Sequence, residues 1–165
     1  MVVQTKDFPW GAGIPLLFAT VATAVIGGVI SGGQSDPWYA SLQKPFLTPP
    51  DLVFAIVWPA LYLLMAGGAM IVLGRAGSFQ RAISPLGIYY TMLAFNTAWS
   101  LVFFGFQDVP LAMGVLVALL LLIIAMMQDF WRYSHLAALL QIPYLIWVSF
   151  AAYLNSSIMI ANSGG

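Results

Sequence analysis

The chain has 165 residues, of which 62% are hydrophobic and only 6% are charged, and its formal net charge at pH 7 is zero. Together with a mean hydropathy of +0.96, this composition excludes a water-soluble globular domain and predicts a polytopic membrane protein. The absence of cysteine excludes disulfides, thiolate metal sites and thiol nucleophiles. No basic run points to a nucleic acid partner.

Five apolar stretches are long enough to cross the ~30 Å core of a bilayer as helices, which takes ~20 residues each. They cover residues 11–30, 52–73, 85–106, 110–128 and 136–158. Because their apolar runs are continuous and do not alternate with a period of two, an outer-membrane β-barrel is excluded. We therefore predict an all-α fold, an integral membrane bundle of five transmembrane helices that forms a single domain over residues 1–165. The first stretch is expected to be a retained span, because it is longer than a typical signal-peptide core and no clear cleavage site follows it.

The basic residues are unevenly distributed between the two sides of this predicted bundle. Lys6, Arg75, Arg81 and Arg132 fall on the side of the N-terminus, whereas Lys44 falls on the other side. The positive-inside tendency then predicts a cytoplasmic N-terminus in a prokaryotic cell membrane. The alternative is the mitochondrial outer membrane, if the source is eukaryotic.

Residues 31–51 form the longest connection, and their composition favours an ordered lid. Prolines restrict the backbone there, Trp38 and Tyr39 bring large apolar faces, and Asp51 is placed to cap the second span. The alternative is a linker whose aromatic side chains rest in the headgroup region. The sequence leaves both interpretations open.

Trp58, Trp99 and Trp147 lie well inside their spans, although membrane tryptophans usually mark the headgroup interfaces. Counted from the span ends that face the long loop, at ~1.5 Å per residue, all three indoles lie roughly 10 to 17 Å below that surface. The sequence therefore predicts that they occupy one layer.

Helical spacing extends each tryptophan into a stripe of residues on one helix face. The stripes are Phe54, Trp58, Tyr62 and Met65, then Asn96, Trp99 and Phe103, and finally Trp147, Ala151 and Leu154. Ordinary bundle core would explain any one of them. Three stripes at matching depth beneath an aromatic loop instead favour a pocket for a flat apolar ligand, with Asn96, Tyr62 and the indole N–H groups as polar contacts.

Other polar and small residues are expected to be structural. Small residues recur along the first span at Ala19, Thr23, Gly27 and Ser31, and again at Gly28 and Gly32. Such faces allow close helix packing, most simply within the chain, and Asn155 is expected to bridge helices or to lie at the interface. The spans contain no ionisable acidic or basic residue, which disfavours ion-coupled transport. His135 has no metal-ligating companions, and no nucleophile with a base is evident.

Several longer motifs occur in order over nearly the whole chain. They are Trp38-Tyr39-Ala40-Ser41-Leu42-Gln43-Lys44-Pro45 with Pro49-Pro50, Trp58-Pro59-Ala60-Leu61-Tyr62, Ala94-Phe95-Asn96-Thr97-Ala98-Trp99 ending in Phe103-Phe104-Gly105, and Pro143-Tyr144-Leu145-Ile146-Trp147 ending in Leu154-Asn155. On these motifs the chain resembles the TspO/MBR family, the translocator proteins also called peripheral-type benzodiazepine receptors or tryptophan-rich sensory proteins. The resemblance implies a five-helix membrane protein, often a homodimer. It also implies binding of porphyrins such as protoporphyrin IX, and of benzodiazepine-type ligands, in a cavity under the first loop.

The resemblance also implies site residues and a possible chemistry. The cavity would be lined by Tyr39, Phe54, Trp58, Asn96, Trp99, Trp147, Ala151 and Leu154. We expect a membrane receptor or sensor that binds a tetrapyrrole and influences its transport or turnover, with no required cofactor. One alternative is a catalyst of light- and oxygen-dependent porphyrin degradation, in which Trp58 and Trp147 would take part. The other is a structural membrane assembly protein.

Two positions depart from the family pattern. Leu47 stands where the family usually has a tryptophan, and Leu101 stands where a proline is common after the tryptophan of the third span. Ligand affinity and packing of the loop are expected to differ accordingly. The tail over residues 156–165 contains no lysine or arginine, so the animal cholesterol motif is not expected here.

Overall fold

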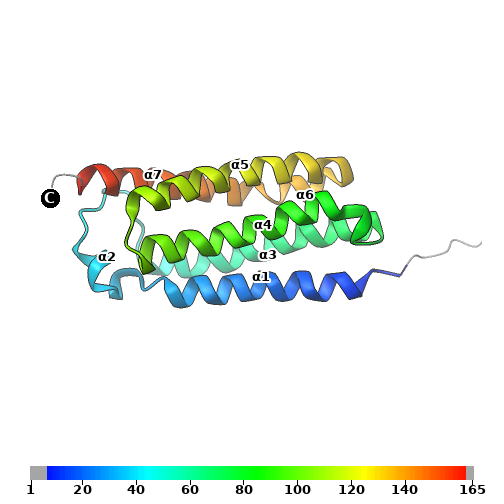
Figure 1. Ribbon diagram of the computed structural model, residues 1–165, viewed down its shortest axis with the longest axis horizontal. Coiled ribbons are helices and arrows are strands. Elements are labelled where there is room, and N and C mark those ends of the chain that lie inside the picture. Colours follow the sequence, from blue (N-terminus) through cyan, green and yellow to red (C-terminus); the bar gives the residue numbers. More distant parts are fainter. Residues whose placement is uncertain (1–6, 163–165) are drawn as a thin grey trace, which may run out of the picture.

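The computed structural model describes residues 7–162, and the regular secondary structure in that range is entirely helical. Five long helices lie side by side in an elongated bundle (Figure 1). They are α1 (Trp10–Ile30), α3 (Asp51–Ala76), α4 (Ile83–Ser100), α5 (Val109–Tyr133) and α7 (Ile142–Ala161). The shorter elements are η1 (Gly33–Ser35), α2 (Pro37–Ser41), η2 (Gln80–Ala82), the π-helical turn η3 (Leu101–Gly105) and α6 (His135–Leu139).

Five helical segments of the described chain are long and apolar enough to cross a membrane. This confirms the predicted all-α fold with five transmembrane helices. One boundary difference is at the end of the fourth span, which the sequence predicts at Gln128 and the structure places at Tyr133. Asp129 and Arg132 form an ion pair of 3.2 Å in this last part of α5. The helix α5 is therefore longer than its apolar stretch, because charged residues can continue a helix beyond the hydrocarbon core of the bilayer.

Polar side chains mark the starts of several helices. Asp36 accepts a hydrogen bond of 2.9 Å from a backbone N–H of α2, and Asp108 and Ser134 cap α5 and α6 in the same way. The prediction that Asp51 caps α3 is wrong, because Pro50 occupies the cap position and Asp51 is the first residue of the helix. In the first turn of α3, the negative charge of Asp51 still interacts favourably with the positive end of the helix dipole.

The two ends of the bundle carry different groups. Arg75, Arg81 and Arg132 lie where α3, η2 and α5 meet, and we call this the arginine end. Residues 31–50, which include α2, cover the opposite end, and we call this the loop end. The helix α1 starts at the arginine end and α7 finishes at the loop end, as an odd number of crossings requires (Figure 1).

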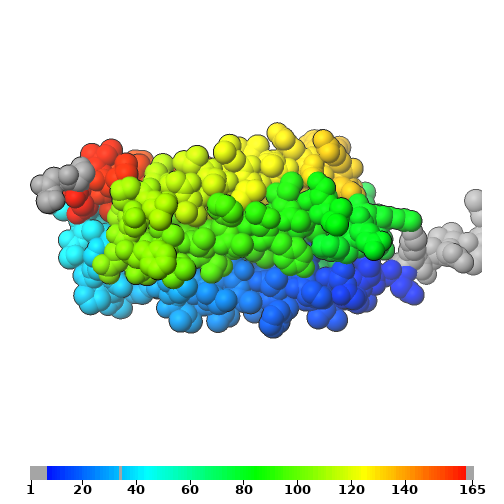
Figure 2. Space-filling view, in the orientation of Figure 1, coloured from blue at the N-terminus to red at the C-terminus, as the bar shows by residue number. Residues whose placement is uncertain are grey.

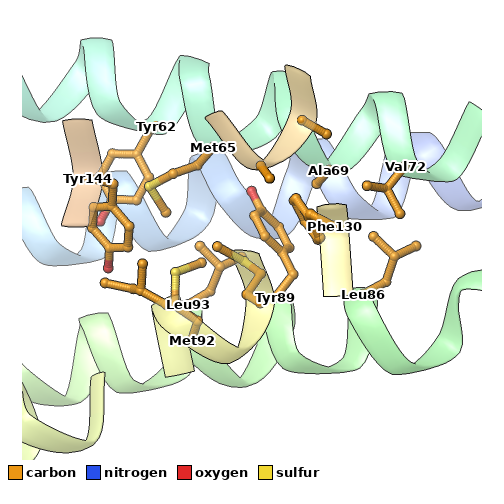
Figure 3. Packing of buried hydrophobic residues seen from close by; sticks show 14 of the residues in the cluster. Tyr62, Met65, Ala69, Val72, Leu86, Tyr89, Met92, Leu93, Phe130 and Tyr144 are labelled. Carbon is orange, nitrogen blue, oxygen red and sulfur yellow. The ribbon is translucent and has the colours of Figure 1, made fainter. Parts of the chain in front are cut away.

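The core is tightly closed towards the arginine end. Tyr89 of α4 and Phe130 of α5 are fully buried among side chains of α3 (Figure 3). A Cβ atom added to Gly68 of α3 would lie 2.8 Å from the carbonyl oxygen of Ala137 and against Nε2 of Gln141. Only glycine permits α3 and α6 to approach so closely.

The same helices leave space at the loop end. The helix α3 packs against α1, α5 and α6 but only lightly against α7. Because α6 is the first part of the last membrane-spanning segment and α7 the remainder, α3 meets this segment closely at one end and loosely at the other.

The outside of the bundle is apolar. In Figure 2, α4 and α5 cover one face of the molecule, with α1 along its edge. Large side chains on α1 point outwards, among them Phe18 and Val29, which are 74% and 80% exposed. Such a surface suits lipid and not water, and the protein is a multi-pass membrane protein.

Candidate ligand cavity

A cavity of about 510 Å³ lies at the loop end, between α1, α3, η3 and α7 and beneath α2. Nine of the ten predicted site residues line it, namely Tyr39, Phe54, Trp58, Tyr62, Trp99, Phe103, Trp147, Ala151 and Leu154. The structure thus brings the three indoles to one cavity, as the count of residues from the span ends predicts.

An aromatic corner forms where α3 meets α7. The rings of Trp58 and Trp147 are 6.5 Å apart and nearly perpendicular, at 86°. Phe54 meets the same Trp147 ring edge-on at 5.6 Å, and Tyr62, one turn further along α3, lies 5.7 Å from Trp58. The two edge-to-face contacts of Trp147 hold its ring in a defined orientation. They also explain why α3 stays apart from α7 here, since large rings fill the gap.

The opposite wall depends on the π-helical turn η3. Trp99 stacks on Phe103 with ring centres 5.3 Å apart and an interplanar angle of 24°, and Phe104 packs edge-on against Trp99 at 6.1 Å. The N–H of Leu101 donates to carbonyl groups of the preceding turn, and its carbonyl accepts from Phe106 at 2.9 Å. A proline at this position would lack the N–H. Leucine therefore continues α4 without a break into the turn that carries the two phenylalanines.

Tyr39 closes the cavity at the loop end and is 7% exposed. Its ring packs against Phe103 and Phe104 at 6.1 and 5.6 Å. The Nζ of Lys44 donates to the Tyr39 carbonyl at 2.6 Å and to two further carbonyls of the loop, and it lies 4.6 Å from the centre of the Tyr39 ring. Burial, and then the nearby Asp51 carboxylate, raise the pKa of the Tyr39 phenol, which is therefore neutral at physiological pH.

The loop is also tied to the end of α7. The side-chain amide of Asn162 accepts from the Gln43 N–H and donates to the Gln43 carbonyl, both at 3.0 Å. The Asn162 amide thus pairs with both backbone groups of Gln43, as a neighbouring peptide group would. Residues 31–50 are thus held by side-chain bonds as well as by ring packing.

Asn96 differs from the other nine predicted residues because it does not line the cavity. Its side chain is buried behind Tyr62, donates to the Tyr144 hydroxyl at 2.8 Å and accepts from the Tyr62 hydroxyl at 3.4 Å. The prediction of a shared face with Trp99 was too coarse, because three residues of helix turn the side chain about 60° short of a full revolution. Asn96 positions Tyr62, which does line the cavity.

Sequence reasoning missed the wall that α1 and its continuation provide. The additional lining residues there are Ala24, Gly28, Ser31, Gly32 and Gly33. On the other elements they are Asp51, Ala55, Pro59, Phe104, Asn155 and Ile158. The small residues of α1 were a partial signal for this wall. Gly27 packs beside Ser100 and Tyr62, as expected for close helix packing. Gly28 has no atom of another element within 4 Å of the position of a Cβ, so it lines the cavity and does not serve helix packing.

Two polar groups in the cavity wall are buried without a protein partner, Nε1 of Trp99 and Oδ1 of Asn155. The other end of the Asn155 amide donates to the Val109 carbonyl at 3.0 Å, so this side chain does bridge α7 and α5. Buried polar groups without partners are uncommon. Their position makes them candidates for hydrogen bonds to a ligand.

The cavity offers shape and aromatic surface more than reactive groups. Among the described residues that line it, only Asp51 carries a charge. Within residues 7–162 no three His, Asp or Glu side chains gather closely enough to hold a metal ion. His135 lies outside the cavity, where it is exposed and stacks on Trp131 at 4.1 Å. The arrangement suits binding of an apolar molecule.

The sequence model of the TspO/MBR family matches residues 15–161. The chain belongs to the TspO/MBR family. Its relatives include the "Tryptophan-rich sensory protein" of Cereibacter sphaeroides, which is 37% identical over 94% of each chain. "Protein CrtK" of Rhodobacter capsulatus is 36% identical over 88% of this chain and 89% of its own. The human "Translocator protein" is 34% identical over 94% of this chain and 93% of its own.

Membership of the TspO/MBR family supports a role as a membrane sensor or receptor. The similarity extends over nearly the full length of these relatives. All five spans and the loop that covers the cavity therefore fall within the shared region, which makes the cavity the natural place to look for the sensed molecule.

Proposed function

We propose that this TspO/MBR protein is a receptor or sensor that binds a tetrapyrrole such as protoporphyrin IX and influences its transport or turnover. The observation that carries the proposal is the cavity of about 510 Å³ with Trp58, Trp99 and Trp147 in its walls. Its volume lies within the ~300 to 1,000 Å³ typical of small-molecule sites. Flat synthetic ligands of the benzodiazepine type would use the same walls.

The ring geometry suits a flat ligand in particular. Because the Trp58 and Trp147 planes are nearly perpendicular, a planar molecule can stack on one indole while its edge meets the other. The Tyr62 hydroxyl, oriented by Asn96, offers a hydrogen bond at the inner end. Tyr39 covers the outer end.

Membrane placement and assembly extend the proposal. We infer a cytoplasmic N-terminus in a prokaryotic cell membrane, because Arg75, Arg81 and Arg132 gather at the end where α1 begins. We also infer a homodimer, as the family resemblance implies. Labelling from either side of sealed vesicles tests the first inference, and mass measurement in detergent tests the second.

Fluorescence titration with protoporphyrin IX tests the binding site. Wild-type protein should show saturable quenching of tryptophan fluorescence. Trp58→Phe combined with Trp147→Phe should weaken binding, because two smaller rings replace the perpendicular indoles. Trp131→Phe is the matched control, since Trp131 is exposed and outside the cavity. Unchanged affinity in the double variant would show that the ligand binds elsewhere.

A second candidate is light- and oxygen-dependent degradation of the bound porphyrin, favoured by two indoles 6.5 Å apart in one wall. Illuminated porphyrin should then lose its absorbance faster with wild-type protein than with the double variant. Equal rates would reject catalysis and leave binding intact. A purely structural assembly protein, the third candidate, would take up no tetrapyrrole at all.

A further inference from the structure

The walls of the cavity differ sharply in how well they are covered. None of the lining residues contributed by α2, η3 and α7 is fully exposed, and Tyr39, Phe103, Leu154 and Ile158 are only 2% to 8% exposed. Five lining residues on the side of α1 and α3 are exposed on the outer surface of the bundle. Gly28 lies on α1 and Ala55 and Pro59 on α3, whereas Gly32 and Asp51 mark the part of this surface nearest the loop. A residue that both lines a cavity and faces outwards marks an opening.

This opening lies on the side of the bundle. Pro59 is eight residues from the start of α3 at Asp51, which at ~1.5 Å per residue places it about 12 Å below the loop end. Gly28 and Ala55 lie nearer that end, on the two facing helices. Apart from the chain neighbours of Gly28 and the nearby backbone of α1 itself, no atom lies within 4 Å of the position that a Cβ on Gly28 would occupy. No other element covers the α1 side of the opening at this residue.

The rims of the opening are apolar. On α1, Val25 and Val29 are 58% and 80% exposed, and on α3, Leu52 and Ile56 are 69% and 63% exposed. In a membrane these apolar side chains favour contact with lipid over contact with water, and Val25 and Ile56 lie about 7 Å below the ends of their helices at ~1.5 Å per residue. The opening thus connects the cavity with the hydrocarbon phase.

The loop end, in contrast, is closed by several contacts. Tyr39 packs on two phenylalanines, Lys44 holds α2 by three carbonyl groups, and Asn162 fastens the loop to α7. These contacts oppose entry from water past α2. A ligand dissolved in the bilayer instead meets Gly28 and Ala55, which are small and are flanked by the apolar rims.

We infer that the cavity exchanges its ligand directly with the lipid phase, through the opening between α1 and α3. The ligands that can use it are apolar molecules that partition into membranes, and the bilayer is both their source and their destination. The inference rests on the proposed function for the identity of the ligand, but the route itself follows from the cavity alone.

A single cysteine can report on this route because the natural chain has none. Ala151→Cys places one thiol on the cavity wall formed by α7. The protein is reconstituted into lipid vesicles and treated with N-(1-pyrenyl)maleimide, an apolar reagent whose fluorescence rises when a thiol adds to its double bond. Adding Gly28→Phe and Ala55→Phe should slow labelling about tenfold or more, because passage then requires displacing two rings at an overpacked rim.

The matched control carries Gly11→Phe and Ala94→Phe together with Ala151→Cys. Gly11 and Ala94 are exposed on α1 and α4 away from the opening, and a Cβ on Gly11 would meet no atom. The control should label at the rate of the parent. A series of Gly28→Ala, Gly28→Leu and Gly28→Phe should slow labelling in order of side-chain size and guards against misfolding of the largest variant.

Equal labelling rates in the filled variant and the control would overturn the inference. So would a rate that responds to Tyr39→Ala and not to the Gly28 series, since that result would place the route at the loop. Failure of protoporphyrin IX to quench the wild-type protein would instead count against the proposed function alone. The labelling experiment tests the route of entry without a tetrapyrrole, so its failure can be distinguished from failure of the proposed function.

Discussion

At the arginine end, α3 lies so close to α6 that Gly68 has no room for a Cβ, whereas at the loop end the rings of Trp58 and Trp147 hold α3 and α7 apart. The same helix thus contributes close backbone packing at one end and a cavity wall at the other. The difference shows that the size of the residues along α3 determines where neighbouring helices pack closely against it. Small residues allow close packing near the arginine end, and large aromatic residues leave a cavity beneath the loop.

The largest effect is expected from breaking the close contact. Gly68→Ala should lower the free energy of unfolding by about 3 kcal/mol, because the added methyl overlaps the Ala137 carbonyl oxygen and Gln141 Nε2. The midpoint of thermal unfolding in detergent measures it. Gly87→Ala is the control, since a Cβ there would meet no atom within 4 Å. Equal midpoints would mean that the two helices can part without loss.

The next effect concerns the open end. Trp147→Ala should weaken protoporphyrin IX binding by roughly 2 kcal/mol, about thirtyfold, because a large aromatic anchor in the cavity wall is lost. Fluorescence titration measures it, with Trp131→Ala as the control at an exposed position outside the cavity. If both variants bound equally, the aromatic corner would not be the ligand site.

A smaller effect is expected where the two regions join. Tyr144→Phe removes the hydroxyl that accepts from Asn96 and leaves a buried amide group unpaired. Stability should fall by about 1 to 2 kcal/mol, again read from the thermal midpoint. Tyr153→Phe, on the exposed side of the same helix, should leave the midpoint unchanged. Similar midpoints for both would show that Asn96 finds another partner.

The smallest effect is local to the loop. Lys44→Met removes the three bonds to loop carbonyls and the contact with the Tyr39 ring. Amide hydrogen exchange over residues 37–44 should become faster by an amount equivalent to about 1 kcal/mol, while global stability stays the same. Arg132→Met, at the arginine end, should not alter exchange in the loop. Unchanged exchange in Lys44→Met would show that ring packing alone holds α2.

Much of the architecture could be predicted because the bilayer imposes a length on every crossing helix. The same constraint made the depth of Trp58, Trp99 and Trp147 countable, and nine of the ten predicted site residues line one cavity. The predicted end at Gln128 was too early, because apolar length reports the hydrocarbon core and not the helix itself. Asp51 was misplaced by one position, since Pro50 also meets the backbone requirements of a helix cap.

The remaining features depend on which helices become neighbours. Asn96 shares a broad face with Trp99 in the sequence pattern, but its neighbours Tyr62 and Tyr144 come from two other helices. Gly27 and Gly28 are adjacent and chemically identical, yet one packs inside the bundle and the other borders an opening. No periodicity within α1 could separate them, because the separation depends on the position of α3.

By itself, the sequence determined that the chain crosses a membrane five times and carries three indoles at one depth, because hydrophobic length and helical rise are local properties. The tertiary structure alone decided that α3 closes on α6 yet stands apart from α7, and that the cavity between them opens towards α1. Those features depend on the sizes of side chains on different helices. Whether such side chains touch or leave a cavity is decided only when the helices pack together.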